Sequence, residues 1–327
     1  MHIDPMIALF GLGVGVLVGM TGVGGGSLMT PVLILIFGIN PVTAIGTDLA
    51  YGAVTKTLGG WRHWRKGNVD LGVSGWMAIG SVPASVLGVI ALKALQRGDK
   101  ASFDGTVLTA VGATLLLCGV AMLARRLLGS SLNERERVDL TPGRRAGAVT
   151  FGLAVGFVLG VTSAGSGALI TVALVFVFRL SPRRVVGTDV FHAALVLWAA
   201  ALAHLVAGDI DFALAGTILI GSLPGVVVGT ALATRVPVGA LRTSLGVLLV
   251  GAGLALVKKA GLNVPTGLLA AFPLGVVLLL AVAHMRARAH PDPRPVTANT
   301  ALRAGRSDRC ARARIRRRRT RAQSASA

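Results

Sequence analysis

Two short polar stretches, Thr21-Gly-Val-Gly-Gly-Gly26 and Thr162-Ser-Ala-Gly-Ser-Gly167, interrupt long apolar segments of this sequence. A shift of 141 residues superimposes the first stretch on the second, and the match extends without a gap over residues 11–88 and 152–229. The matched positions are mostly Gly, Pro, Thr, Asp and His, whereas shared apolar composition alone would match Leu and Val. The chain is therefore an internal duplication, and the two polar stretches are equivalent points in its two copies.

The composition indicates a helical membrane protein. Hydrophobic residues make up 53% of the chain and charged residues only 14%, whereas about a quarter of the residues of a soluble domain are charged. Most apolar blocks approach the roughly 20 residues that a helix needs to cross the hydrocarbon core. They do not alternate as barrel strands do, and lipid leaves backbone groups no water to bind, so helices are expected. The blocks are 42–60, 71–92, 105–124, 185–207, 212–233 and 243–257.

Each repeat begins with an apolar stretch that is too long for one simple helix, residues 7–37 and 149–178. The Gly/Ser/Thr cluster falls in the middle of each stretch. Because glycine tolerates unusual backbone angles, we predict that each stretch forms two half-helices around an unwound turn. Three ordinary spans follow in each repeat.

Charge indicates which ends of the spans face the cytoplasm, because cytoplasmic loops carry an excess of Lys and Arg. Basic residues concentrate in the loops 61–68, 125–145 and 179–184, whereas residues 208–211 contain two aspartates and no cation. Basic loops flank the broken stretch of the second repeat on both sides. This stretch should therefore enter and leave on the cytoplasmic side as a re-entrant pair.

These considerations predict an all-α polytopic protein of two inverted repeats, each with a broken re-entrant helix pair and three spans. One extra C-terminal span gives seven full spans, with the N-terminus outside and the C-terminal tail in the cytoplasm. Counting each broken stretch as one span gives nine spans instead. The predicted regions are a first transmembrane repeat, 1–124; a basic cytoplasmic loop, 125–145; a second repeat, 146–257; the extra span, 258–285; and the tail, 286–327.

The tail carries 13 arginines against Asp292 and Asp308 and few large apolar residues. We expect it to be disordered and to bind anionic lipid headgroups. No aromatic residue lies between its arginines, so nucleic acid is not an expected partner.

The two broken stretches are the candidate substrate site. Half-helix N-termini present free N–H groups and partial positive charge, so an anion can bind there without a buried cation. The alternative is that Gly and Ser simply allow close helix packing. The predicted substrate-binding residues are Thr21, Gly22, Gly24, Gly25, Gly26, Ser27, Thr47, Thr162, Ser163, Gly165, Ser166, Gly167 and Thr188.

Asp48 and Asp189 follow Gly-Thr at the start of a span in each repeat. An intramembrane carboxylate indicates function, here proton coupling, although helix capping is an equal alternative. His192 lies three residues after Asp189, on the same helix face, and is a candidate proton relay or anion contact. The more conservative interpretation places His63 and His204 at the interface and lets Lys56 extend to the headgroups. We find no metal-ligand spacing, nucleotide loop or hydrolase motif, and expect no cofactor, no metal and no enzymatic activity.

The same residues resemble the sulfite exporter TauE/SafE family. The resemblance rests on the paired glycine clusters, the paired Gly-Thr motifs and the segment His204-x3-Gly208-x-x-Asp211, and it covers about residues 7–257. It implies a permease for small sulfur-containing or organic anions such as sulfite, sulfonates or sulfoacetate. Ser163 and Ser166 depart from the pattern, because they replace two of the glycines.

We therefore expect a secondary transporter that exports a small anion across the bacterial inner membrane. A non-transporting scaffold that acts through the Arg-rich tail, and an anion channel, are the alternatives. Association into a homo-oligomer stays open.

Overall fold

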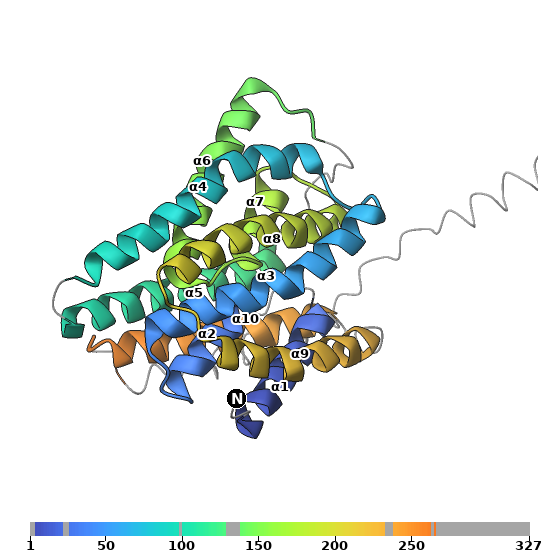
Figure 1. Cartoon of the computed structure of the whole chain (residues 1–327). Coiled ribbons are helices and arrows are strands. Elements are labelled where there is room, and N and C mark those ends of the chain that lie inside the picture. Colours follow the sequence, from blue (N-terminus) through green and yellow to red (C-terminus); the bar gives the residue numbers. More distant parts are fainter. Residues whose placement is uncertain are drawn as a thin grey trace, which may run out of the picture. The chain divides into compact units, whose positions relative to one another are not determined.

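The computed structural model describes residues 4–21, 26–97, 100–128, 138–232, 238–262 and 265. These residues all belong to one compact unit, Met1–Pro273, whereas the second unit, Leu274–Ala327, lies outside the described residues. The predicted Arg-rich tail and most of the predicted extra span therefore lie outside them as well. The regular elements of the described part are ten helices, which confirms the predicted all-α class (Figure 1).

The helices repeat in order, five in each copy. The first repeat contains α1 (Pro5–Thr21), α2 (Gly26–Leu35), α3 (Pro41–Arg65), α4 (Leu71–Leu95) and α5 (Lys100–Leu128). The second contains α6 (Pro142–Thr162), α7 (Ala168–Phe176), α8 (Pro182–Val206), α9 (Phe212–Leu232) and α10 (Val238–Lys259).

Each initial stretch contains two helices, as predicted. α1 ends at Thr21 and α2 begins at Gly26, while α6 ends at Thr162 and α7 begins at Ala168. In the second break the backbone turns through left-handed conformations, with φ of 54° at Ser163 and 100° at Gly165. The arms are unequal, because α6 has 21 residues and α7 has 9. α6 is therefore longer than the half-helix expected from the sequence.

Five helices of the described part are long and apolar enough to cross a membrane. The predicted total of seven spans stays a prediction, because the last expected span lies mostly outside the described residues. The five segments are Leu71–Leu95, Ser102–Ala124, Pro142–Thr162, Pro182–Val206 and Phe212–Gly229.

Each repeat packs against the other through reciprocal glycine seams. α4 lies against α6, and its equivalent α9 lies against α1. A Cβ atom at Gly156 would collide with the carbonyl oxygen of Ser81, and one at the equivalent Gly15 would collide with that of Ser222. Small residues thus let the backbones approach closely. Each of these contacts thus has a counterpart in which the two repeats are exchanged.

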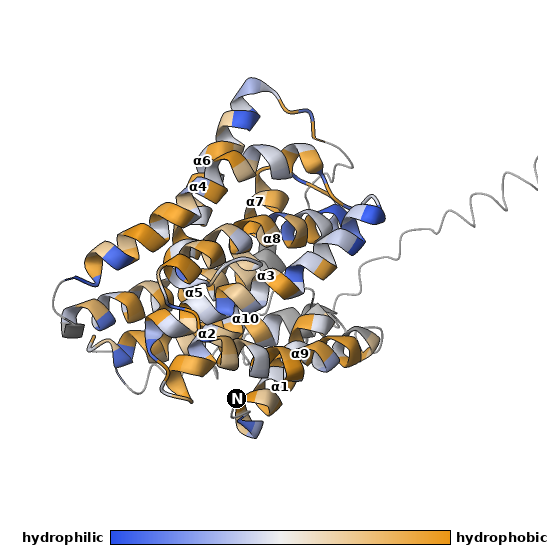
Figure 2. Ribbon diagram, in the orientation of Figure 1, coloured by the Kyte–Doolittle hydropathy of each residue, from blue (hydrophilic) through white to orange (hydrophobic). Residues whose placement is uncertain are grey.

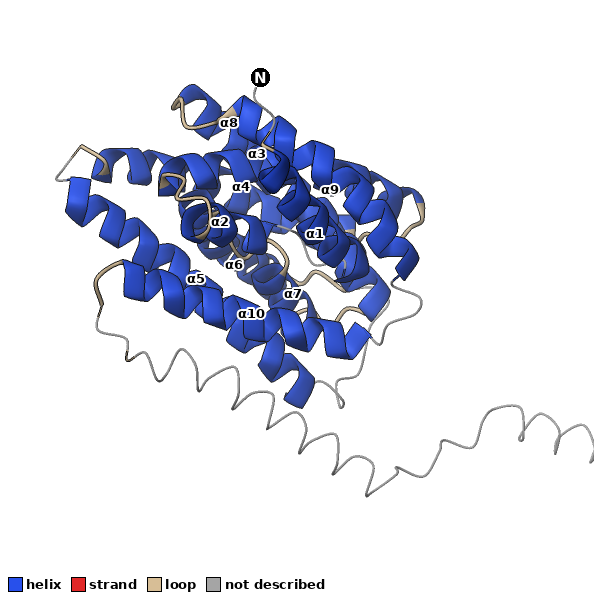
Figure 3. Ribbon diagram, turned by 90° about the horizontal axis from the view of Figure 1, so that it is seen from below, coloured by secondary structure: helices blue, strands red, loops and turns tan. Residues whose placement is uncertain are grey.

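Equivalent helices run antiparallel where they meet. α5 and α10 lie side by side (Figure 3). Gly112 on α5 lies against Gly253 on α10, and Gly119, further along α5, lies against Gly246, earlier on α10. α3 and α8 are also antiparallel, since Gly52 lies close to Leu197 while Gly60, further along α3, lies close to Phe191, earlier on α8.

The starts of α4, α6 and α8 lie at one end of the unit. Gly187 on α8 approaches Asn68 in the α3–α4 loop, and Gly72 at the start of α4 approaches Leu140 before α6. We call this end the basic end because of its Arg and Lys residues. Figure 2 shows hydrophilic residues at its loop between α3 and α4. The opposite end contains the α8–α9 loop with Asp209. The cations of the basic end are Arg62, Arg65, Lys66, Arg144, Arg145, Arg183 and Arg184.

Candidate functional site

The beginning of α3 places Asp48 inside the helix. Asn40 caps α3, because its side-chain oxygen accepts a hydrogen bond of 3.0 Å from Val42 N, and Pro41 occupies the first turn. Thr47 and Asp48 therefore lie about two turns further along, and the capping interpretation for them is wrong. α8 begins with Pro182, so Asp189 is equally internal.

The Asp48 carboxylate is fully buried and joins the two repeats. Its Oδ2 accepts hydrogen bonds from Thr30 Oγ1 on α2 at 2.6 Å and from Ser163 Oγ in the α6–α7 turn at 2.7 Å. The two hydroxyl oxygens also lie 2.6 Å apart. Asp48 Oδ1 is buried without a hydrogen-bond partner among the described residues. A buried acceptor of this kind is costly unless something else binds it.

Lys56 is also buried and reaches the same turn. Its Nζ donates hydrogen bonds to Ser166 Oγ at 2.8 Å and to Ser166 O at 3.2 Å, and the residue is only 6% exposed. The expectation that Lys56 extends to the headgroups is therefore wrong. α3 packs between other helices, so the ammonium finds its partners inside the protein.

These contacts form what we call the central polar cluster. Gly165 N donates a hydrogen bond of 3.1 Å to Ser27 Oγ, which ties the first turn of α2 to the break in the second repeat. Both broken helices and α3 thus meet at one buried place. The cluster consists of Ser27, Thr30, Asp48, Lys56, Ser163, Gly165 and Ser166.

Sequence reasoning missed two members of this cluster. Thr30 carries a signal in the repeat, since its equivalent Thr171 donates a hydrogen bond of 3.3 Å to Asp189 Oδ2, as Thr30 does to Asp48. Lys56 carries no such signal, because its equivalent is Leu197. A lysine near the end of an apolar block looks the same whether it snorkels or is buried.

The structure does not bring every predicted residue into the cluster. Thr47 Oγ1 accepts a hydrogen bond of 3.1 Å from Asp211 N, and Thr188 Oγ1 accepts one of 2.8 Å from Asp70 N. Thr47 thus holds the α8–α9 loop of the second repeat, and Thr188 holds the α3–α4 loop of the first repeat. The two loops lie at opposite ends of the unit. Thr162 Oγ1 donates to Val158 O at 2.7 Å within its own helix.

The remaining predicted residues divide into those that are described and those that are not. Gly167 precedes the first residue of α7. Gly22, Gly24 and Gly25 lie outside the described residues, and for Thr21 and Gly26 the structure gives only the helix ends.

His192 is fully buried on α8 and faces α4. Its Nε2 lies 3.1 Å from Ser81 Oγ, and its Nδ1 lies 3.5 Å from Ser74 Oγ. Asp189, three residues earlier on α8, accepts a hydrogen bond from Thr171 instead. The structure thus gives His192 two neutral hydroxyl partners, and its role as a relay stays a prediction.

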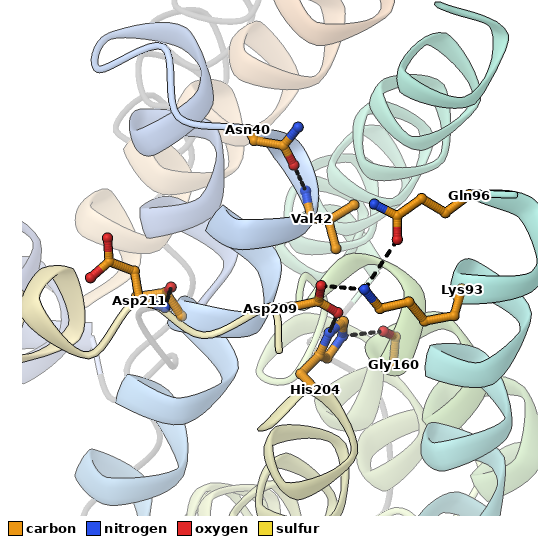
Figure 4. A network of polar contacts seen from close by, with 9 residues as sticks. Asn40, Val42, Lys93, Gln96, Gly160, His204, Asp209 and Asp211 are labelled. Atoms are coloured by element: carbon orange, nitrogen blue, oxygen red, sulfur yellow. Dashed lines mark hydrogen bonds and ion pairs between the residues drawn. The ribbon is translucent and has the colours of Figure 1, made fainter. Parts of the chain in front are cut away.

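A second polar network lies at the opposite end from the basic end (Figure 4). His204 is fully buried, so its expected interfacial position is wrong, whereas His63 is only partly buried. His204 Nδ1 lies 3.0 Å from Asp209 Oδ2, and Nε2 lies 3.3 Å from Gly160 O. Lys93 Nζ donates to Asp209 Oδ1 and, at 3.1 Å, to Gln96 Oε1.

Asp209 is ionised in this network, which we call the terminal network. Partial burial raises the pKa of Asp209, but the hydrogen bonds and charges of His204 and Lys93 outweigh it, so the pKa lies below its ordinary value. The network fixes the α8–α9 loop to α4 and α6. The position equivalent to Asp209 is Asn68 at the basic end, so the two ends differ in charge.

An all-helical fold with several helices long and apolar enough to cross a membrane, and with charged side chains buried among them, is typical of a multi-pass membrane transport protein. The chain matches the family described as sulfite exporter TauE/SafE over residues 7–256 and belongs to that family. This confirms the resemblance found in the sequence. The family is one of membrane transporters rather than enzymes.

Two relatives from Bacillus subtilis (strain 168) are similar over most of their length. The chain is 36% identical to "Probable membrane transporter protein YjnA" over 253 residues, which cover 77% of this chain and 98% of the relative. It is 28% identical to "Probable membrane transporter protein YdhB" over 236 residues, covering 71% and 91%. No solved structure matches the chain.

Proposed function

We propose that the chain is a secondary transporter that exports a small anion, such as sulfite, a sulfonate or a related organic anion, across the bacterial inner membrane. The observation that carries this proposal is the central polar cluster, in which both broken helices meet two buried charged residues of α3. Secondary transporters commonly build their sites from broken helices at the interface of two repeats. The family and the names of the relatives support transport as such.

The proposed arrangement in the membrane is that of inverted repeats. Equivalent helices that run antiparallel, as α5 and α10 do, support it, because a twofold axis across the helices exchanges the two sides of the membrane. The excess of Arg and Lys at the basic end supports a cytoplasmic position for that end. α1 runs parallel to α9, which starts at the opposite end, so the N-terminus would be outside.

The same reasoning supports a re-entrant pair in the second repeat. α6 runs parallel to α4 and α8 runs antiparallel to α3, so α6 and α8 both begin at the basic end. The chain from α6 through the break to α7 would then enter and leave on the cytoplasmic side.

In this proposal the substrate anion binds beside the breaks, and Asp48 and Asp189 exchange protons during the cycle. The first turns of α2 and α7 offer backbone N–H groups with partial positive charge. A carboxylate buried among hydroxyl groups can be charged in one state and neutral in another at tolerable cost. His192, on the same helix as Asp189, would relay protons.

Proteoliposomes that contain the purified full-length chain test this function. Uptake or efflux of radiolabelled sulfite and sulfonates should exceed that of empty liposomes and should respond to an imposed pH gradient. A variant that ends at residue 285 should retain the flux, which separates transport from a role of the tail. Absence of flux for every anion tested would contradict the proposal.

A further inference from the structure

Lys56 is a buried amino group whose hydrogen-bond partners, in the part of the chain that the structure describes, are neutral. Among the described residues its hydrogen bonds go only to Ser166 Oγ and Ser166 O, which are both neutral atoms. An ammonium has three N–H donors, so one remains available. Buried charges are normally paired directly with an opposite charge, because an unpaired charge in an apolar interior is costly. A site with this geometry is suited to receive an anion.

Two aspartates influence Lys56 from a distance. Asp48 lies about two turns away on the same helix, and the charges of both Asp48 and Asp189 act on the lysine. Neither forms a salt bridge with it in the described part of the chain. Among the described residues, the Lys56 Nζ atom therefore bonds only neutral oxygens, and one of its N–H donors stays open to a ligand.

The other titratable groups nearby already have hydroxyl partners. The Tyr51 hydroxyl on α3 lies near Ser222, and His192 on α8 faces Ser74 and Ser81 of α4. Asp48, by contrast, keeps Oδ1 buried without a partner in the described part of the chain. The carboxylates are thus the groups best placed to respond when the charge near Lys56 changes.

On the basis of the proposed function, we infer that Lys56 binds the charged group of the substrate, and that one of the two aspartates, Asp48 or Asp189, takes up a proton from water as the anion binds. With all three side chains ionised, the group has one positive and two negative charges. A monoanion at Lys56 adds one more negative charge, and protonation of a carboxylate removes one. The site therefore favours a small monoanion with an oxygen-rich head, and it binds anion and proton together.

Titration calorimetry of the full-length protein with sulfite and with methanesulfonate, at slightly acid pH, tests this inference. Lys56→Gln should weaken binding by about tenfold or more, because it removes a charge-assisted hydrogen bond. Lys56→Arg keeps the charge and should retain measurable binding. Lys259→Gln is the matched control, since Lys259 Nζ also donates to a main-chain oxygen, Ile34 O, at 2.9 Å, but outside the cluster.

The possible results separate the two proposals. If the wild-type protein binds neither anion, the proposed function fails and the role of Lys56 fails with it. If the wild type binds and Lys56→Gln binds as tightly as Lys259→Gln, only the role of Lys56 is overturned. Should Lys56→Gln not fold, the wild type is titrated in two buffers of different ionisation enthalpy. Different heats, corresponding to proton uptake, support the inference, and equal heats overturn it.

Discussion

Ser163 Oγ donates a hydrogen bond of 2.7 Å to Asp48 Oδ2, and the two residues come from opposite repeats. Ser163 is also where the backbone leaves α6 in a left-handed conformation, with φ of 54°. Any change in the charge of Asp48 therefore acts directly on the turn that breaks the helix of the second repeat. This link provides a physical route by which proton binding can alter the conformation around the central polar cluster.

Asp48→Asn should separate exchange from proton-driven transport. Asparagine keeps an oxygen that can accept the hydrogen bonds of Thr30 and Ser163, so the fold should persist, but it cannot bind a proton. We expect flux driven by a pH gradient to fall by about tenfold or more, while exchange of labelled for unlabelled anion persists. Both are measured in proteoliposomes. Retention of full pH-driven flux by Asp48→Asn would exclude Asp48 as the coupling group.

The glycine seam predicts a sharp contrast between two positions of α6. Gly156→Ala should destabilise the protein by about 1–3 kcal/mol, because the new methyl group would collide with Ser81 O. Gly147→Ala should be neutral or stabilising by up to about 1 kcal/mol, since open space surrounds that position and alanine favours helix. Thermal unfolding in detergent compares the two variants. Equal unfolding temperatures would mean that the seam does not hold α4 and α6 together.

Thr188→Val tests whether the paired Gly-Thr motifs bind substrate or hold loops. The change removes the acceptor of Asp70 N and should cost about 1 kcal/mol of stability. Because Thr188 on α8 contacts Asp70 at the start of α4 and is not in the central polar cluster, we expect anion affinity to stay unchanged. Calorimetry and thermal unfolding measure the two quantities separately. A large loss of affinity with unchanged stability would restore Thr188 to the substrate site.

The terminal network predicts a pH-dependent contribution to stability. Since the pKa of Asp209 is lowered in the folded protein, its contribution is present at neutral pH and is lost as the pH falls below the ordinary carboxyl value of about 4. Asp209→Asn should lower stability by roughly 1 kcal/mol at neutral pH and by less in acid. Unfolding temperatures across the pH range check this. A constant difference between variant and wild type would show that another group carries the effect.

Much of this architecture could be predicted from the sequence, because many residues that the two repeats share allow close helix contacts or helix ends. Glycine at 15 and 156 is required by close backbone contacts, and the breaks after Thr21 and Thr162 follow from runs of residues that favour turns. These features are local, or are repeated in register, so a single sequence contains them. The unequal lengths of α6 and α7 were not visible, since apolar residues continue on both sides of the break.

The contacts of individual charged side chains could not be predicted, because they depend on which helices pack together. Lys56 lies on an apolar block near basic residues, and its position there indicates nothing about Ser166 on a different repeat. His204 similarly finds Asp209 and Gly160, and the second of these is distant in the sequence. Thr30 is an exception, because the equivalent position of the second repeat is also a threonine, Thr171.

The most direct test of the account is the reactivity of a cysteine at Ser166 towards a charged methanethiosulfonate reagent in membrane vesicles, with Cys310 replaced by serine. The native Cys118 is buried and free, and provides the background rate in the parent protein. The account predicts that Ser166→Cys reacts well above that background and that a transported anion slows the reaction. Reaction no faster than the background, with or without anion, would contradict a water-accessible anion site between the broken helices.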